Sequence, residues 1–228
     1  MMGIDFEVKR STRRKTISLK IQDAKVYLYV PFTLKLEKTL PFLLKKQNWI
    51  HANLQEQVKA ESFLKKDFIN GDGFLFLGEP IQLKHKKTKG KSIVLNGDVL
   101  LLCLPELFSD RESRVRMVKN WYRQQAVAYI TERVAYWKPK IGVTIGGISV
   151  RTYKSRWGSC DSQGHLKFNW KLIMAPKFVV DYVVVHELCH RVYMNHSILF
   201  WQLVESHFPA TASAKTWLKK NEGTLSFT

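Results

Sequence analysis

The sequence has no long hydrophobic run. No stretch approaches the roughly 18 uninterrupted apolar residues that a membrane-spanning helix needs, so we expect no membrane span. Residues 1–15 carry Asp5 and Glu7 and then a basic run without an apolar segment behind it. This start does not resemble a signal peptide.

Cysteine and acidic residues are also scarce. The three cysteines, Cys103, Cys160 and Cys189, are scattered and odd in number, which argues against a disulfide framework and favours a reducing, cytoplasmic setting. Only 19 Asp and Glu stand against 37 Lys and Arg, for a formal net charge of +18. Such a field attracts nucleic acid, other polyanions or phosphorylated substrates. Because no recognisable nucleic-acid-binding motif accompanies the charge, a merely solvated surface is an equal alternative.

Hydrophobic residues make up 45% of the chain and aromatic residues 12%, enough for a sizeable folded core. In the first half their spacing predicts one long helix over residues 34–65 and strands at 4–9, 15–21, 25–30, 74–77, 81–85 and 99–104. In the second half it predicts strands at 148–154 and 165–173. It also predicts three helices, over 109–137, from Pro176 through Leu188 and over 197–207. Pro139 is expected to end the helix over 109–137. We therefore expect an α+β fold, with a β-rich region over residues 1–105 and a second domain over residues 106–228.

The second domain contains one motif with specific chemistry. His186, Glu187 and His190 form the pattern H-E-x-x-H on a predicted helix. Residues i and i+4 lie one turn apart on the same helical face, so the two imidazoles can bind one metal ion. Glu187 lies about 100° further round, where it can take a proton from a zinc-activated water without binding the metal. The buried, Val-rich setting favours this interpretation over a chance surface pair, because burying an acid is costly.

A catalytic zinc site needs a third protein ligand and one open position. His196 follows the helix where the chain must turn before the next helix, and a short turn brings it back toward the metal. His207 and Glu205, on the following helix, are alternatives. The chemistry favours His196 but leaves these alternatives open.

An ordered set of segments around the motif resembles a known family. The segments are residues 154–160, 169–170, 172, 175–176, 181–190, 195–197 and 200–201. They are similar to the YgjP-like metal-dependent hydrolases, relatives of the SprT-like and WLM metalloproteases. The resemblance is close over about residues 150–210 and looser in the first half of the chain.

This resemblance implies a zincin-like catalytic domain whose Zn²⁺ is bound by His186, His190 and His196, with Glu187 as general base. Members of the family are zinc metallopeptidases, and some are UTP pyrophosphatases, so the resemblance specifies the metal site better than the substrate. Cys189 departs mildly from the family, in which a small residue such as Ala is also common at this position. Its place on the helix points it off the ligand face, which predicts a packing role.

Arg156 is a further catalytic candidate. It lies in an Arg-Trp-Gly-Ser loop, from which its guanidinium could stabilise an oxyanion or bind a phosphate. The alternative, slightly favoured, is a structural loop in which Gly158 makes the turn and Trp157 packs. In either case Asn169 is a candidate to fix the loop by hydrogen bonding.

Three functions are compatible with these features. The first is a zinc-dependent peptidase acting on polypeptide. The second is a nucleotide pyrophosphatase, although phosphoanhydride hydrolysis usually uses Mg²⁺ held by carboxylates, and no carboxylate cluster accompanies the histidines. The third is a nucleic-acid-binding module with structural zinc, which ranks last because structural sites are normally closed by four ligands. A protease recruited to nucleic acid combines the first and the third. The peptidase is the favoured function. We expect the strands at 148–154 and 165–173 to lie beside the His186 helix.

Overall fold

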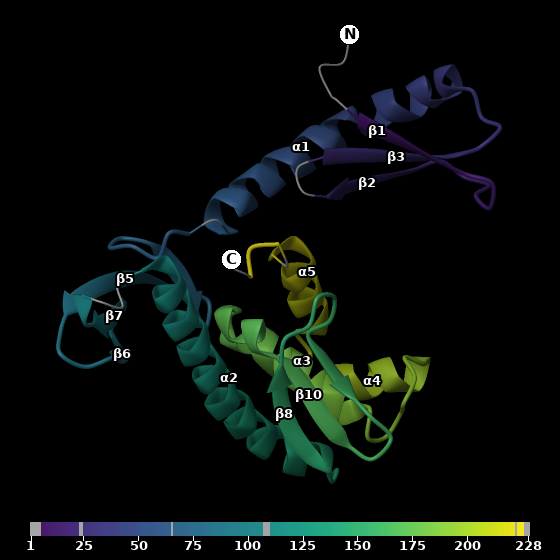
Figure 1. Cartoon of the computed structure of the whole chain (residues 1–228). Helices are drawn as coiled ribbons and strands as arrows, with labels where there is room; N and C mark the ends of the chain where they lie inside the picture. Colours follow the sequence, from purple (N-terminus) through teal and green to yellow (C-terminus); the bar gives the residue numbers. More distant parts are fainter. Residues whose placement is uncertain (1–5, 23–24, 65, 107–109, 222, 226–228) are drawn as a thin grey trace. The chain divides into compact units, whose positions relative to one another are not determined.

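The computed structural model describes residues 6–22, 25–64, 66–106, 110–221 and 223–225. The chain divides into two compact units, residues 1–65 and 66–228. Each unit contains both helices and strands (Figure 1), so the fold is a mixture of α and β structure, as expected. None of the described helices combines the length and the hydrophobicity that crossing a lipid bilayer requires.

The first unit is a three-stranded sheet packed against one long helix. Its strands, in the spatial order β1-β3-β2, are β1 (Phe6–Ser11), β2 (Ser18–Gln22) and β3 (Lys25–Pro31). Strand β3 runs parallel to β1 and antiparallel to β2. A short 3-10 helix, η1 (Leu36–Thr39), leads into α1 (Leu40–Leu64). Residues 23–24, between β2 and β3, lie outside the described residues.

Alternate residues of β3 make the core of the first unit. Val26, Leu28 and Val30 are buried and pack in one cluster with Leu43 and Ile50 of α1. Successive residues of a strand point to opposite faces, so this face of the sheet is covered by the helix. The residues between them project from the other face.

The second unit contains two further sheets. One has the order β4-β5-β7-β6 and is built from β4 (Gly73–Phe76), β5 (Glu79–Lys87), β6 (Ser92–Asn96) and β7 (Val99–Leu104). The other has the order β8-β10-β9 and is built from β8 (Gly147–Arg151), β9 (Gly158–Cys160) and β10 (His165–Asn169). Strand β10 is parallel to β8 and antiparallel to β9.

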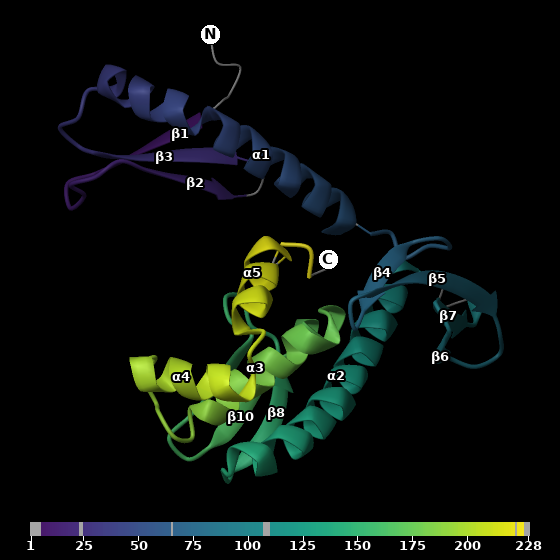
Figure 2. The ribbon, with the colours of Figure 1, turned by 180° about the vertical axis from the view of Figure 1, so that it is seen from behind.

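Helices complete the second unit. They are α2 (Arg111–Ile141), the 3-10 helix η3 (Trp170–Met174), α3 (Lys177–Cys189), α4 (Ile198–His207) and α5 (Thr211–Asn221). Helix α3 lies between α2 on one side and α4 and α5 on the other (Figure 2). It is therefore surrounded by other elements, as its apolar sequence predicts.

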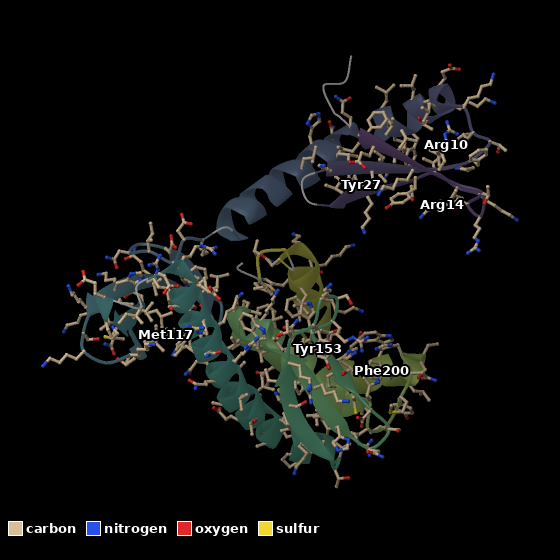
Figure 3. All side chains as sticks on the ribbon, in the orientation of Figure 1. Arg10, Arg14, Tyr27, Met117, Tyr153 and Phe200 are labelled. Carbon is tan, nitrogen blue, oxygen red and sulfur yellow. The ribbon has the colours of Figure 1, made fainter. Side chains whose placement is uncertain are left out.

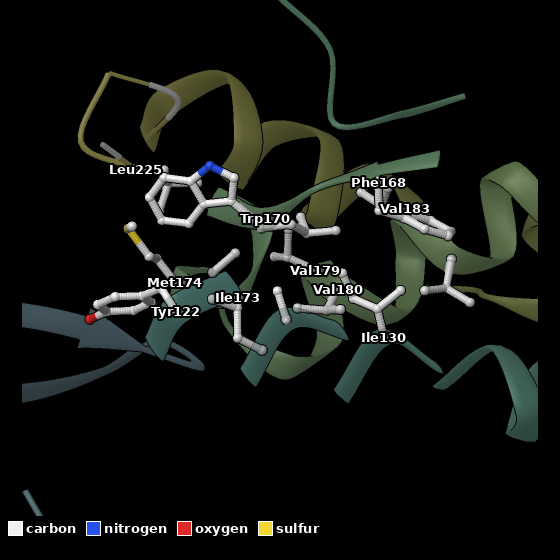
Figure 4. Close-up of a cluster of buried hydrophobic side chains, with 14 of the residues drawn as sticks. Tyr122, Ile130, Phe168, Trp170, Ile173, Met174, Val179, Val180, Val183 and Leu225 are labelled. Carbon is white, nitrogen blue, oxygen red and sulfur yellow. The ribbon is translucent and has the colours of Figure 1, made fainter. Parts of the chain in front are cut away.

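Both sheets of the second unit share one core with α2 and α3. Tyr122 and Ile130 of α2 pack with Ile173 and Val180 in this core (Figure 4). The Tyr122 hydroxyl donates a hydrogen bond to the carbonyl oxygen of Leu75 at 2.8 Å, which ties α2 to the four-stranded sheet. The boundary between the units accordingly lies between residues 65 and 66, earlier than the expected boundary between 105 and 106. Strands β4 to β7 belong to the β-rich region expected over residues 1–105, but their buried side chains join the core of the second unit.

A charged contact anchors α3 to α2. Arg133 Nε donates to Asp181 Oδ1 at 2.5 Å, and Trp137 Nε1 donates to the same oxygen at 3.0 Å. Both side chains of the ion pair are mostly buried. Because Asp181 lies little more than one turn before His186 in the same helix, this contact helps to position the motif.

Some boundaries differ from those that the sequence pattern predicts. Helix α2 continues through Pro139 and ends only at Gly142, whose φ of 75° is the left-handed conformation that terminates many helices. The strand expected over 165–173 stops at Asn169, because the Asn169 side chain accepts a hydrogen bond from the Lys171 amide and begins η3 instead. The segment between the two strands predicted at 148–154 and 165–173 contains a further strand, β9. Hydrophobic periodicity also does not predict β6 or α5.

Candidate metal centre

The motif lies at the C-terminal end of α3. Pro176 precedes the helix, where its missing N–H costs nothing, and Val183, Val184 and Val185 are buried directly before the first histidine. His186 is in the last turn of α3, and His190 is the residue that caps its end. The motif therefore lies on a helix as expected, except that its last residue, His190, stands at the cap just after the helix.

A tight turn brings His196 back to the two motif histidines. The amides of Val192 and Tyr193 both donate to the carbonyl oxygen of Cys189, at 3.0 Å each, which reverses the chain after the helix. Ser197 then caps α4, its hydroxyl accepting from the Phe200 amide at 3.3 Å. The segment between the two helices is consequently short, as predicted for a returning ligand.

The three imidazoles form a nearly regular triangle. Ring centroids are separated by 4.9 Å between His186 and His190, 5.0 Å between His186 and His196, and 4.8 Å between His190 and His196. One potential ligand atom from each ring lies within 4.8 Å of the others, and no other group of this kind occurs in the described part of the chain. Neither alternative third ligand, Glu205 or His207, belongs to the group.

The geometry fits one shared metal ion. His186 Nε2 and His196 Nε2 are 3.1 Å apart. Two nitrogens bound tetrahedrally to zinc at about 2.0–2.1 Å would be about 3.3 Å apart. His190 Nδ1 lies 3.0 Å from the carbonyl oxygen of Tyr193, which can only accept, so this nitrogen carries the hydrogen and leaves Nε2 free as a ligand. The His186 and His196 nitrogens thus lie at nearly the spacing that two zinc ligands need, and a ligand atom of His190 lies within 4.8 Å of them.

Burial favours the neutral form of two of these imidazoles, His186 and His190. It lowers the pKa of His186 to about 3, and the neighbouring His190 and His196 and the cation of Lys215 add to the effect. Burial likewise lowers the pKa of His190. Metal ligation needs an unprotonated nitrogen, so no proton has to be displaced from these two rings at neutral pH.

Aromatic side chains of α4 support the triangle from one side. The buried Phe200 ring (Figure 3) lies 5.0 Å from His186, 4.5 Å from His190 and 4.9 Å from His196, measured between centroids. Trp201 stacks on His196 at 5.5 Å, with Lys215 Nζ 3.9 Å from the Trp201 ring. These contacts restrict the orientations of the imidazole rings before any metal binds.

Glu187 is buried beside the triangle and faces β9. A Cβ atom added to Gly158 would meet Glu187 Oε1 at 2.5 Å, so the strand approaches the carboxylate as closely as only glycine permits. Burial raises the pKa of Glu187 to about 8, and the nearby charge of Arg156 lowers it in part. The role expected for Gly158, making a turn, is wrong: the residue begins a strand and makes room for the acid.

The loop that carries Arg156 is held by Asn169, as predicted. The buried Asn169 amide donates to the carbonyl oxygens of Tyr153 at 3.1 Å and Arg156 at 3.2 Å. The Arg156 side chain is exposed, and its guanidinium carbon lies 5.6 Å from the Tyr153 ring centroid. The loop therefore has a structural tether, while its guanidinium remains within electrostatic range of Glu187.

Some features of the site cannot be read from the motif. The predicted packing role of Cys189 is confirmed, since its side chain is fully buried in the core. Sequence alone gives no chemical sign of three features of the site. They are the contacts of the Phe200 ring with the histidines, the cation of Lys215, and the close approach of Gly158 to Glu187. Their only signal was that Phe200 and Gly158 fall within the segments shared with the resembling family.

Comparisons with known proteins identify the family of this chain. The family model of the YgjP-like metallopeptidase domain matches residues 15–221. The chain belongs to the YgjP-like metallopeptidase family. No match was found among curated proteins.

Two solved structures resemble part of this chain. One is the metallopeptidase zymogen of Pyrococcus abyssi abylysin, with 20% identity and a TM-score of 0.37, covering 41% of this chain and 95% of that one. The other is the metallopeptidase zymogen of Methanocaldococcus jannaschii jannalysin, with 18% identity and a TM-score of 0.37, covering 41% and 96%. Family membership implies a hydrolase with a metal cofactor.

Proposed function

We propose that this YgjP-like protein is a zincin-like peptidase that binds zinc through His186, His190 and His196. The observation that carries the proposal is the triangle of three imidazoles with one buried carboxylate beside it. Three nitrogen ligands leave one position open, which is the arrangement of catalytic rather than structural zinc. Zinc in such a site acts as a Lewis acid on a substrate carbonyl and lowers the pKa of water.

Glu187 supplies the base in this proposal. Its carboxylate accepts the proton of the attacking water and later delivers it to the amine that leaves when the peptide bond breaks. Without a metal the acid would stay protonated at neutral pH, since burial raises its pKa to about 8 even though the charge of Arg156 opposes the rise. The positive charge of Arg156 favours the ionised form, and a divalent cation at the histidines acts in the same direction. Arg156 thus tunes the base and is placed to stabilise developing negative charge.

The alternative function is nucleoside triphosphate pyrophosphatase, with UTP as a substrate. The high positive charge would attract a triphosphate. Among the described residues, however, the one metal-binding group contains only imidazoles. Magnesium, the usual ion for phosphoanhydride chemistry, prefers oxygen ligands.

A paired assay separates the two functions. Zinc-loaded protein is incubated in parallel with an unfolded polypeptide such as casein and with each nucleoside triphosphate, and new amino termini and released pyrophosphate are measured. We expect polypeptide cleavage that a chelator abolishes and zinc restores. Release of pyrophosphate at a higher rate, without new amino termini, would overturn the peptidase assignment.

Gly158→Ala tests the contact between β9 and the base. The added Cβ would meet Glu187 Oε1 at 2.5 Å, so the carboxylate must shift. We expect polypeptide hydrolysis to fall by about 10²-fold, since small displacements of a catalytic group cost this much, while zinc content is unchanged. Gly90→Ala is the matched control, because a Cβ there meets nothing within 4 Å. Full activity in Gly158→Ala would contradict the proposed position of the base.

A further inference from the structure

One face of the first unit is unused by the metal centre. Because Val26, Leu28 and Val30 face α1, Tyr27 and Tyr29 project from the opposite face of the sheet. Both tyrosines are half-buried. Within the described part of this unit, α1 is the only helix besides η1, and it covers the valine and leucine face. The Tyr27 ring lies on the side of the sheet opposite α1 (Figure 3).

The strand register surrounds these rings with cations. Lys20 of β2 pairs with Tyr27, and Lys9 of β1 pairs with Tyr29, so all four side chains project from one face. Lys9 Nζ lies 4.5 Å from the centroid of the Tyr27 ring. The guanidinium carbon of Arg14 lies 4.7 Å from the centroid of the Tyr29 ring. We call this surface the tyrosine face; it consists of Lys9, Arg14, Lys20, Lys25, Tyr27 and Tyr29.

The tyrosine face is strongly positive. Its four cations are opposed by Glu7, the only carboxylate on the described residues of the three strands. Glu7 lies 3.9 Å from Lys25, and both side chains are more than half exposed, so this pair is weak. Arg10 is excluded from the surface, because it donates to the carbonyl oxygens of Phe32 and Leu34 and so holds the chain after β3. Arg14 Nη1 donates to the Ser18 hydroxyl at 2.6 Å, but this partner is neutral and leaves the charge of Arg14 uncompensated. The four cations of the face can therefore attract an anionic partner.

This surface is suited to a partner that carries both phosphates and flat rings. Nucleic-acid bases stack on tyrosine, and lysine or arginine beside the ring contacts the backbone phosphates. Tyr27 and Tyr29 are two residues apart in one strand, so their Cα atoms are separated by about 6.8 Å. That is twice the ~3.4 Å rise per nucleotide in one strand of a duplex. Bases stacked on both rings must come from an unstacked strand, which a duplex cannot supply.

We propose that the tyrosine face binds single-stranded nucleic acid, with bases stacked on Tyr27 and Tyr29 and phosphates beside Lys9, Arg14 and Lys20. The proposal is independent of the peptidase function, because no residue of the face belongs to the metal centre. It gives the excess of positive charge in the first unit a specific partner.

Fluorescence anisotropy with the full-length, zinc-loaded protein tests the proposal. The probes are fluorescein-labelled 12-nucleotide single-stranded DNA and RNA of one sequence, the corresponding duplex, and a heparin fragment that carries charge without bases. We expect a single strand to bind more tightly than duplex and heparin at about 150 mM salt, and comparison of DNA with RNA identifies the sugar. Tyr27→Leu/Tyr29→Leu should weaken single-strand binding by about 10-fold or more, whereas Tyr27→Phe/Tyr29→Phe should retain it.

A pair of charge variants provides a second, matched test. Lys9→Gln/Lys20→Gln should reduce affinity and lower the salt-dependence slope by about 0.7 for each phosphate that the protein no longer neutralises. Lys45→Gln/Lys46→Gln removes the same charge from exposed positions of α1 and should leave the affinity and the salt-dependence slope unchanged. If the Tyr27→Leu/Tyr29→Leu variant does not fold, the comparison of the two lysine pairs still tests the proposal. Equal binding to heparin, equal weakening by both lysine pairs, or no binding of either single strand would overturn the proposal.

Discussion

Glu187→Gln should lose polypeptide hydrolysis by at least about 10²–10⁴-fold, the contribution of general-base catalysis, while it keeps the fold and the metal. Glutamine has nearly the same shape and still accepts a hydrogen bond, but it cannot take a proton from water. The buried carboxylate packs against Gly158, so an isosteric replacement preserves that contact. Zinc content, melting temperature and the rate of new amino-terminus formation should be measured on the same preparation.

Glu205→Gln is the matched control for this substitution. It removes one carboxylate from an exposed position of α4, outside the metal-binding group, and should leave hydrolysis unchanged. Unchanged hydrolysis in zinc-replete Glu187→Gln would remove the base from the mechanism. Loss of zinc in that variant would instead show that Glu187 is a ligand or supports one.

His196→Ala should lower zinc affinity as severely as His186→Ala. Loss of a partner that only orients a ligand already costs 10–100-fold in metal affinity, so loss of a ligand should cost more than about 100-fold. The physical reason is the spacing of 3.1 Å between His196 Nε2 and His186 Nε2, which is short enough for both nitrogens to bind one ion. Competition titration with a chromogenic chelator measures the affinity directly.

His207→Ala serves as the control for the third ligand. His207 lies at the end of α4 and is not part of the imidazole triangle, so its removal should leave zinc affinity within about twofold. A large loss of affinity in His207→Ala, with none in His196→Ala, would reverse the assignment. Equal retention in all three histidine variants would mean that the triangle does not hold the metal.

Local chemistry made part of the site predictable. The spacing of His186 and His190 places them on one helical face wherever that helix lies, so the motif could be recognised without the fold. The return of His196 could also be anticipated, because the chain has to turn before α4. The ligand roles themselves stay predictions until metal is measured.

The remaining features depend on tertiary packing that sequence periodicity does not report. Glu187 and Gly158 are in contact because β9 packs against α3. Nothing in the sequence around either residue indicates that the two are close in space. The same limit explains the domain boundary. Strands β4 to β7 could be recognised in part from their alternation, but which core they join depends on contacts such as that of Tyr122 with Leu75.

The compact arrangement of the histidines has a consequence for how the protein responds to losing its metal. The proposed ligands, the Tyr193 carbonyl and the Phe200 ring all fall within residues 186–201, so a bound ion would act as a clip across one short stretch of chain. Its removal would free the junction between α3 and α4 without touching the large core built on α2. Metal loss should therefore appear as faster backbone amide exchange confined to this junction, in a protein that otherwise stays folded.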